Sequence, residues 1–167
     1  MTVRDLVLWP DPRLRQVCAP IAAVTPEIET LAEDLLETMY DAPGRGLAGP
    51  QVGAMLRIFV MDTGWKDGEP CPMVFLNPEI ETRSKAVAET SEGCLSLPGL
   101  SVSVTRPAEV TLRWMDLSGA RKTGRFSGFA AACVQHELDH LDGVVTLDHL
   151  APDTRRRAEE RYADVNA

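Results

Sequence analysis

The sequence lacks several features that would assign it to a specialised class of protein. It contains no run of about 18 apolar residues, so no segment is predicted to cross a membrane. Its start leads into only a short apolar patch before Pro10, which argues against a secretory signal peptide. No internal repeat or low-complexity segment is evident. We therefore expect residues 1–167 to form a single domain that is cytoplasmic and has no membrane partner.

Basic residues and paired cysteines are also scarce. The chain has 17 Lys and Arg against 25 Asp and Glu, which gives a net charge of -8. This balance excludes a general affinity for nucleic acid. The four cysteines are widely spaced and form no C-x-x-C pair, which predicts reduced thiols rather than a disulfide framework.

Two of the only three histidines stand close together, with a glutamate between them. On a helix, positions four apart share one face, so His136 and His140 can both reach one cation. Glu137 is displaced by one position and can hold a metal-bound water. Apolar residues flank the pattern, and Ser127 is the predicted N-cap of this helix. The pattern predicts a metal site whose third ligand lies elsewhere.

Two other stretches have the composition of functional loops. In residues 92–99, a glycine, a proline and an adjacent acid predict irregular, exposed backbone around Cys94. A free cysteine is usually a small buried apolar residue, but its thiolate would suit zinc or ferrous iron as the third ligand. Residues 44–53 are rich in glycine, which allows the backbone to approach a ligand, and they lack the GK[ST] ending of a phosphate loop. Gln51 is the polar side chain there that can both donate and accept hydrogen bonds.

The expected architecture is α+β, with antiparallel sheets packed around a central metal-binding helix and with N- and C-terminal helices outside. Thr25 and Pro26 begin the first helix, which ends near Asp41, and a last helix starts near Pro152. A surface loop is expected at residues 62–72 and a hairpin turn at residues 116–119. The expected strands are residues 56–61, 73–77, 102–104, 110–115 and 122–126, with one or two more within 79–91.

Three stretches, taken together and in this order, resemble the peptide deformylase family: Gly44–Gln51, Glu92–Ser96 and Gln135–Leu141. The resemblance covers nearly the whole chain. It implies a metal-dependent hydrolase that removes the N-formyl group from the N-terminal methionine of newly made polypeptides and releases formate. It also implies one divalent ion, Fe(2+) in the cell, while Zn(2+) or Ni(2+) can occupy such a site in purified protein.

The resemblance also implies a role for each site residue. Glu137 is expected to be the general acid and base, and Gln51 and the backbone N–H of Leu95 are expected to stabilise the oxyanion. The expected metal ligands are Cys94, His136 and His140. The residues expected to contact substrate are Arg45, Gly46, Gly93, Phe129 and Cys133.

Four positions depart from the family pattern. Arg45 stands where the family has an aliphatic residue lining the methionine pocket, and Gly49 replaces an alanine. Ser101 stands where many bacterial members carry an arginine that holds the substrate backbone, and Ala132 is smaller than usual. None of them is a metal ligand or Glu137, so we expect the chemistry to survive. Arg45 predicts a weaker preference for formyl-methionine, or a preference for an acidic or more polar side chain.

Two alternatives stand beside the deformylation of nascent chains. One is a divergent enzyme that hydrolyses another N-acyl or N-formyl substrate. The other is an inactive metal-binding or ribosome-associated module, which would need neither Glu137 nor Gln51. The last helix has arginines at 155–157 spaced against Glu159 and Glu160, which favours a solvated surface over a basic docking face. The resemblance implies that this helix can contact the ribosome transiently, as it does in some family members. We expect a monomer with no specific nucleic-acid partner.

Overall fold

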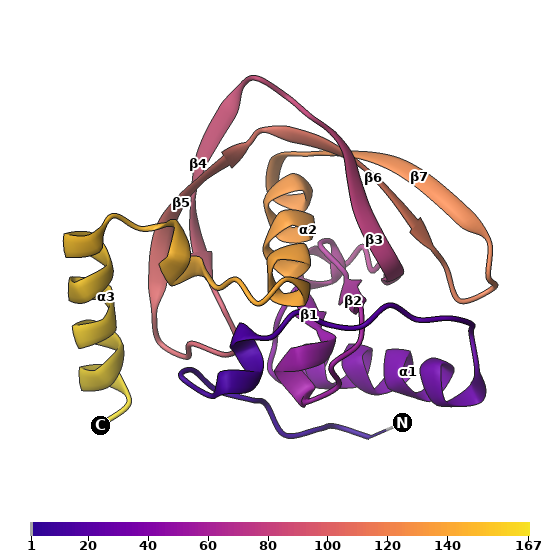
Figure 1. Ribbon diagram of the computed structural model, residues 1–167, viewed down its shortest axis with the longest axis horizontal. Helices are drawn as coiled ribbons and strands as arrows, with labels where there is room; N and C mark the ends of the chain where they lie inside the picture. The colour runs from indigo at the N-terminus through magenta and orange to yellow at the C-terminus, as the bar shows by residue number, and fades with distance from the viewer. Residues whose placement is uncertain (1) are drawn as a thin grey trace.

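The computed structural model describes residues 2–167, and in it helix α2 stands in the middle of the molecule, under an arch of strands (Figure 1). The α-helices in this range are α1 (Pro26–Asp41), α2 (Gly128–Leu141) and α3 (Pro152–Val165). The strands are β1 (Gly46–Ala48), β2 (Ile58–Met61), β3 (Met73–Arg83), β4 (Val87–Gly93), β5 (Ser101–Pro107), β6 (Glu109–Met115) and β7 (Arg121–Ser127). Short 3-10 helices are η1 (Pro12–Arg15), η2 (Gly49–Val52), η3 (Trp65–Asp67) and η4 (Thr146–His149).

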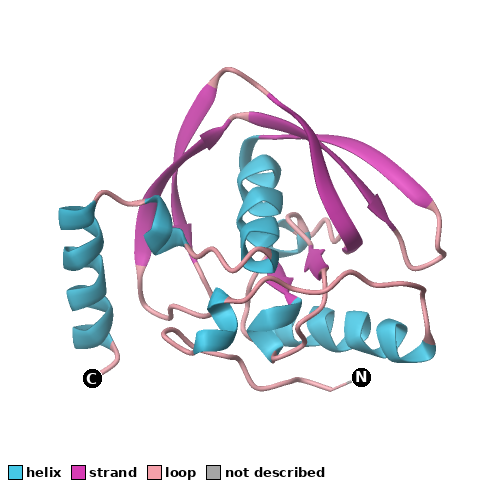
Figure 2. Cartoon of the chain, in the orientation of Figure 1, coloured by secondary structure: helices cyan, strands magenta, loops and turns pink. Residues whose placement is uncertain are grey.

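The strands form two antiparallel sheets. A five-stranded sheet has the order β1-β2-β3-β6-β7, and a separate pair consists of β4 and β5. Every pairing is antiparallel. Helix α2 lies between the sheets, whereas α1 and α3 lie at opposite ends of the molecule (Figure 2). The predicted α+β fold with a central helix is therefore confirmed.

The first helix forms as its sequence predicts. The Thr25 hydroxyl accepts a hydrogen bond from the N–H of Ile28 at 3.4 Å, and Pro26 occupies the first helical position. The apolar stripe of α1 packs against β1, β2 and β3, at one edge of the five-stranded sheet. At α2 the prediction is wrong in one respect. Ser127 is the N-cap residue, but its side chain makes no capping bond, and the chain enters the helix through Gly128 at a φ of +57°.

Two segments differ from the predicted boundaries. Strand β3 was expected to end at Asn77 but continues through Pro78 to Arg83. The pairing with β6 shifts register between Leu76 and Glu79. A proline can stand at such a bulge because its missing N–H is not needed for the ladder. The glycine-rich residues 44–53 were expected to be a loop but include β1, which pairs with β2.

The core consists of three apolar clusters, and α2 contributes to the central one. Phe59, Phe75 and Trp114 from the five-stranded sheet pack there against the buried face of α2. A second cluster lies under α1, and a third lies between η1, β5 and α3. Among residues 2–167 no cysteine is in a disulfide, and no helix is long and apolar enough to traverse a bilayer.

Candidate active site

Helix α2 and the end of β4 bring three metal-binding side chains together. His136 and His140 stand one turn apart on α2 with ring centroids 5.0 Å apart. Cys94 follows β4, and its Sγ lies 3.4 Å from Nε2 of His140. One ligand atom from each of the three residues lies within 4.8 Å of the others. Ligands around one tetrahedral zinc-like ion are separated by roughly 3.5 Å, so the donor set fits a single cation.

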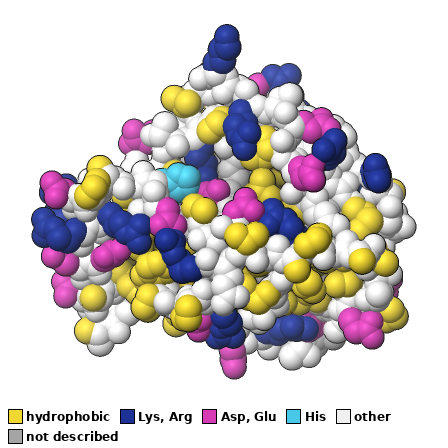
Figure 3. All heavy atoms as spheres, viewed as in Figure 1, with side chains coloured by type: hydrophobic (Ala, Val, Ile, Leu, Met, Phe, Trp, Pro, Cys, Tyr) yellow, Lys and Arg dark blue, Asp and Glu magenta, His cyan; other side chains and the backbone are white. Residues whose placement is uncertain are grey.

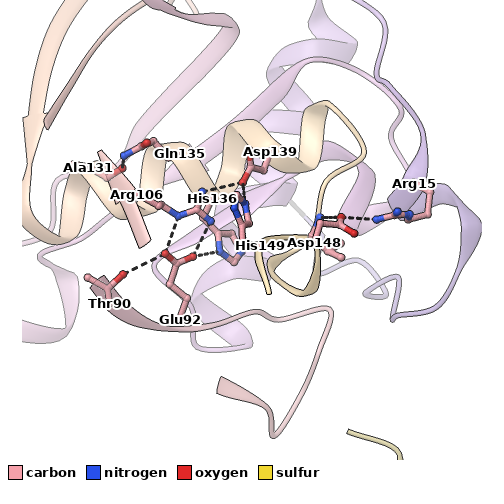
Figure 4. Close-up of polar contacts among 11 residues, drawn as sticks. Arg15, Thr90, Glu92, Arg106, Ala131, Gln135, His136, Asp139, Asp148 and His149 are labelled. Carbon is pink, nitrogen blue, oxygen red and sulfur yellow. Dashed lines mark hydrogen bonds and ion pairs between the residues drawn. The ribbon is translucent and has the colours of Figure 1, made fainter. Parts of the chain in front are cut away.

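A buried ion pair orients the first histidine (Figure 4). Nδ1 of His136 lies 3.0 Å from Oε1 of Glu92. Burial acts to raise the pKa of Glu92, but hydrogen bonds from His136 and Arg106 lower that pKa to about 2. The carboxylate is therefore the acceptor, Nδ1 carries the hydrogen, and Nε2 keeps its lone pair for a cation.

The same arginine continues the network across α2. Arg106 donates to both oxygens of Glu92, at 2.8 and 2.9 Å, and to Oδ2 of Asp139 at 2.8 Å. Nε2 of His149 lies 2.8 Å from that Asp139 oxygen. His149, which belongs to none of the three sequence motifs, thus has a structural contact next to the site. Arg106 joins β4, β5 and α2 through two carboxylates.

Glu137 lines the same cavity as Cys94 and His136 and is almost fully buried. Burial raises its pKa to about 7, and the nearby Glu92 carboxylate acts in the same direction. A group with a pKa close to neutrality can both accept and release a proton there. The backbone of β1 lies against it. A Cβ on Gly46 would be 2.8 Å from Oε2 of Glu137 and 2.9 Å from Sγ of Cys133, so this position has room only for glycine.

Gln51 is held rigidly next to Cys94. Its Oε1 accepts from the N–H of Ala48 at 3.0 Å, and its Nε2 donates to the Ser96 hydroxyl at 3.0 Å. The same Nε2 lies 3.6 Å from Sγ of Cys94. Because its carbonyl oxygen is already engaged by backbone, the amide group is oriented with its donor towards the ligand cluster.

The predicted site residues surround one cavity of about 710 Å³. Its lining includes Arg45, Gly46, Gln51, Gly93, Cys94, Leu95, Phe129, Cys133, His136 and Glu137. His140 lies behind the lining and is 1% exposed. Burial lowers the pKa of His140, and the Arg106 guanidinium acts in the same direction, which favours the neutral imidazole that a cation requires. Burial and Glu137 raise the pKa of Cys133, so this second thiol in the wall stays protonated.

The sequence analysis did not identify Arg106 or the function of Glu92. A signal was present, because Val102, Val104 and Arg106 alternate along β5 and all three are buried. An arginine in phase with buried valines requires a buried acid as its partner. The identity of that acid depended on the pairing of β4 with β5, which the sequence alone did not reveal.

Comparison with known proteins places the chain in a family. A family model described as polypeptide deformylase matches residues 3–156. The peptide deformylase of Afipia carboxidovorans is 46% identical over 97% of this chain and 95% of its own length. That of Nitrobacter hamburgensis is 45% identical over the same shares of the two chains.

Solved structures agree with the sequence comparison. The crystal structure of a peptide deformylase from Legionella pneumophila has a TM-score of 0.92 and 36% identity, covering 99% of this chain and 96% of its own. One from Ehrlichia chaffeensis in complex with actinonin has a TM-score of 0.90 and 35% identity, covering 96% of each chain. The resemblance noted in the sequence is thereby confirmed, and the chain belongs to the polypeptide deformylase family of hydrolases.

Proposed function

We propose that this protein removes the formyl group from the N-terminal methionine of newly made polypeptides in the cytoplasm and releases formate. The observation that carries the proposal is a cluster of Cys94, His136 and His140 behind and along the wall of one cavity that also contains the buried carboxyl group of Glu137. Membership of the deformylase family supports the same reaction. The presence of both Glu137 and Gln51 in the cavity lining supports an active enzyme over an inactive metal-binding module.

Each residue has a physical task in this hydrolysis. A divalent cation held by Cys94, His136 and His140 would supply Lewis-acid chemistry, polarising the formyl carbonyl and acidifying water. Glu137 accepts a proton from the attacking water and then delivers it to the amine as the C–N bond breaks. The amide of Gln51 and the backbone N–H of Leu95 donate to the oxygen that gains negative charge. One such donor typically contributes about 3 kcal/mol of transition-state stabilisation.

We infer that the working metal is ferrous iron. A thiolate and two imidazoles also suit zinc and nickel, which bind such sites at least as tightly, so purified protein can carry a different ion from the one used in the cell. Anaerobic reconstitution of the apoprotein with Fe(2+), Zn(2+) or Ni(2+), followed by metal analysis and kinetics, tests this. Higher turnover with zinc than with iron at equal occupancy would contradict it.

We further propose that the protein is a monomer whose contact with the ribosome, if made through α3, is weak and transient. On the face shown in Figure 3, acidic and basic side chains are interspersed at the α3 end of the molecule. Arg155 pairs with Glu159 at 2.8 Å and Arg156 with Glu160 at 3.3 Å. Much of the positive charge of the helix is thus neutralised within it. Light scattering and ribosome co-sedimentation at two salt concentrations test both points.

The activity is tested by formate release from formyl-Met-Ala-Ser by anaerobically prepared, iron-loaded protein. We expect Glu137→Gln to lose at least about 10²-fold in kcat, the usual contribution of a positioned acid–base group, while it retains the metal. Glu33→Gln removes an exposed carboxylate from α1 and serves as the matched control. Equal turnover by the two variants would remove Glu137 from the mechanism, and an inert wild-type protein at full metal occupancy would overturn the proposed function.

A further inference from the structure

Arg45 lies in the wall of the catalytic cavity without an ionic partner. It stands between Gly44 and Gly46, directly before β1. Its Nε is buried and makes no hydrogen bond within residues 2–167. Its guanidinium carbon lies 5.2 Å from the centroid of the Phe129 ring, and Phe129 is 53% exposed. Arg45 is therefore half-buried in the cavity wall, with its guanidinium beside the exposed Phe129 ring.

Within residues 2–167, the two cations in the cavity lining have no ionic partners, whereas its two acids are buried or paired. The lining contains two acids, Glu92 and Glu137, and two cations, Arg45 and Lys66. Glu92 is fully engaged by Arg106 and His136, and Glu137 is buried beside the metal ligands. Neither Arg45 nor Lys66 forms an ion pair with any residue in the described part of the chain. In the described chain, the cavity lining thus carries unpaired positive charge, on Arg45 and Lys66, that can interact with an anion.

The position of Arg45 relative to the reacting group is set by its neighbours. The adjacent Gly46 lies against Glu137 and Cys133, and the carbonyl oxygen of Arg45 accepts from Sγ of Cys133 at 3.9 Å. Arg45, Phe129 and Cys133 therefore form part of the cavity wall next to the carboxyl group of Glu137. This wall combines an aromatic ring, a thiol and one guanidinium.

We propose that this cavity accepts, as a further substrate class, N-formyl peptides whose formylated residue carries a carboxylate side chain, and that Arg45 is the residue that selects it. The inference rests on the proposed deformylase activity and specifies its substrate. A glutamate-sized side chain lays its methylene groups against Phe129 and brings its carboxylate to the guanidinium, which binds carboxylates through two parallel hydrogen bonds. The hydrolysis is unchanged: water adds to the formyl carbon, the C–N bond breaks, and the leaving amine takes the proton.

The test compares two substrates of equal shape and different charge, formyl-Glu-Ala-Ser and formyl-Gln-Ala-Ser, with formyl-Met-Ala-Ser as the reference. The ratio of kcat/KM for the Glu peptide to that for the Gln peptide is measured in wild type, Arg45→Met and Arg45→Lys. We expect the ratio to fall roughly tenfold in Arg45→Met, the size of one charge-assisted hydrogen bond at a partly exposed site. Arg45→Lys should retain part of it, and 0.5 M salt should reduce the ratio in wild type but not in Arg45→Met. Lys122→Met, which removes an exposed cation from β7 outside the cavity, is the control.

The outcomes separate this inference from the proposed function. In one outcome, formyl-Met-Ala-Ser is hydrolysed, but the ratio of kcat/KM for the Glu peptide to that for the Gln peptide is the same in wild type and Arg45→Met. This result would overturn the inference and leave the proposed deformylase activity standing. If no peptide is hydrolysed, the proposed function fails, and binding decides the inference. Calorimetry with the metal-loaded Glu137→Gln variant should then show tighter binding of the formyl-Glu peptide, and a further change of Arg45 to Met should abolish the difference. Equal binding of the two peptides would overturn it, and near-identical thermal midpoints for the Arg45 variants exclude misfolding.

Discussion

Arg106 and Glu92 form a buried ion pair whose side chains are 6% and 7% exposed. The desolvation of two charges offsets most of their attraction, so such a pair adds little net stability. Its value lies in orientation, because Glu92 also holds Nδ1 of His136 and thereby aims the other ring nitrogen at the cation. A polar network in the middle of the fold thus acts through a metal ligand without touching the metal.

Replacing Arg106 with Met should expose this role. The substitution leaves Glu92 buried without its partner, which should cost about 3–5 kcal/mol of unfolding free energy. Metal affinity should fall about 10- to 100-fold because His136 loses its fixed orientation. Chemical denaturation and metal competition measure the two effects. Arg113→Met, which breaks an exposed pair with Glu79, should change neither measurably, and an unchanged metal affinity in Arg106→Met would refute the orienting role.

Gly46 makes a second prediction at this scale. Gly46→Ala should push the carboxyl group of Glu137 or the thiol of Cys133 out of place, since the new Cβ would lie less than 3 Å from both. A displacement of about 1 Å at a catalytic group can lower turnover about 10²-fold. We expect kcat to fall much more than the thermal midpoint. A Gly46→Ala variant with the kcat of wild type would show that the neighbouring atoms can shift without displacing the carboxyl group of Glu137.

At the scale of elements, the segment between β2 and β3 is the surface loop that its prolines and glycines predict, yet a single buried carboxylate organises it. Asp62 accepts from the Tyr40 hydroxyl at 2.6 Å and from the backbone N–H groups of Gly64, Trp65 and Cys71 at 3.0 to 3.2 Å. The Nε1–H of Trp65 in turn donates to the carbonyl of Gly44 at 2.8 Å, next to Arg45. Loop order therefore extends to the wall of the cavity.

The pKa of Asp62 gives this loop a pH dependence. Burial acts to raise that pKa, but the hydrogen bonds from Tyr40 and the backbone lower it below the ordinary value of 3.8. Its contribution to stability is therefore complete above about pH 4 and is lost as the pH falls through the lowered value. Asp62→Asn should be less stable than wild type by about 1–3 kcal/mol at pH 7, and the gap should narrow below pH 4. Denaturation at several pH values tests this, with the exposed Asp67→Asn as the control; a gap that persists at low pH would contradict it.

The elements also show how far a sequence can be interpreted. Thr25, Pro26 and the apolar stripe were sufficient to predict α1 because helix signals are local. The spacing of four between His136 and His140 was likewise sufficient to place both on one face of a helix. Strand pairing is not local. The bulge that lets β3 pass Pro78, and the pairing of β4 with β5 that joins Glu92 to Arg106, depend on which strands become neighbours. The ionic network and the exact wall of the cavity therefore required the structure.

At the scale of the whole molecule, the candidate metal site adds a further link between α2 and the two-stranded sheet, which the Arg106 network already joins. Cys94 follows the two-stranded sheet, whereas both histidines belong to α2, which packs on the five-stranded sheet. A cation bound by all three residues would link the two-stranded sheet to α2. Metal binding should accordingly be linked to folding.

Removal of the metal should lower the stability of the entire fold. Binding of an ion only to the folded chain stabilises it by about 2.7 kcal/mol when the free ion is at 100 times its Kd. We expect a chelator to lower the thermal midpoint and zinc to restore it. In Cys94→Ser the midpoint should respond far less to either treatment. If a chelator leaves the thermal midpoint of the wild-type protein unchanged, the ion does not contribute to the stability of the fold.

Residues near the N-terminal end of the described chain support the backbone at Gln51 and next to Cys94. The N–H of Val7 donates to the carbonyl of Gln51 at 2.7 Å, and that of Trp9 donates to the carbonyl of Ser96 at 2.8 Å, whereas the last candidate ligand in the sequence is His140. During synthesis, the thiol of Cys94 is therefore made well before the two imidazoles of the candidate site. Until then it is an unprotected thiol, open to oxidation or to binding of a soft metal. A translational pause between these codons would lengthen that exposure.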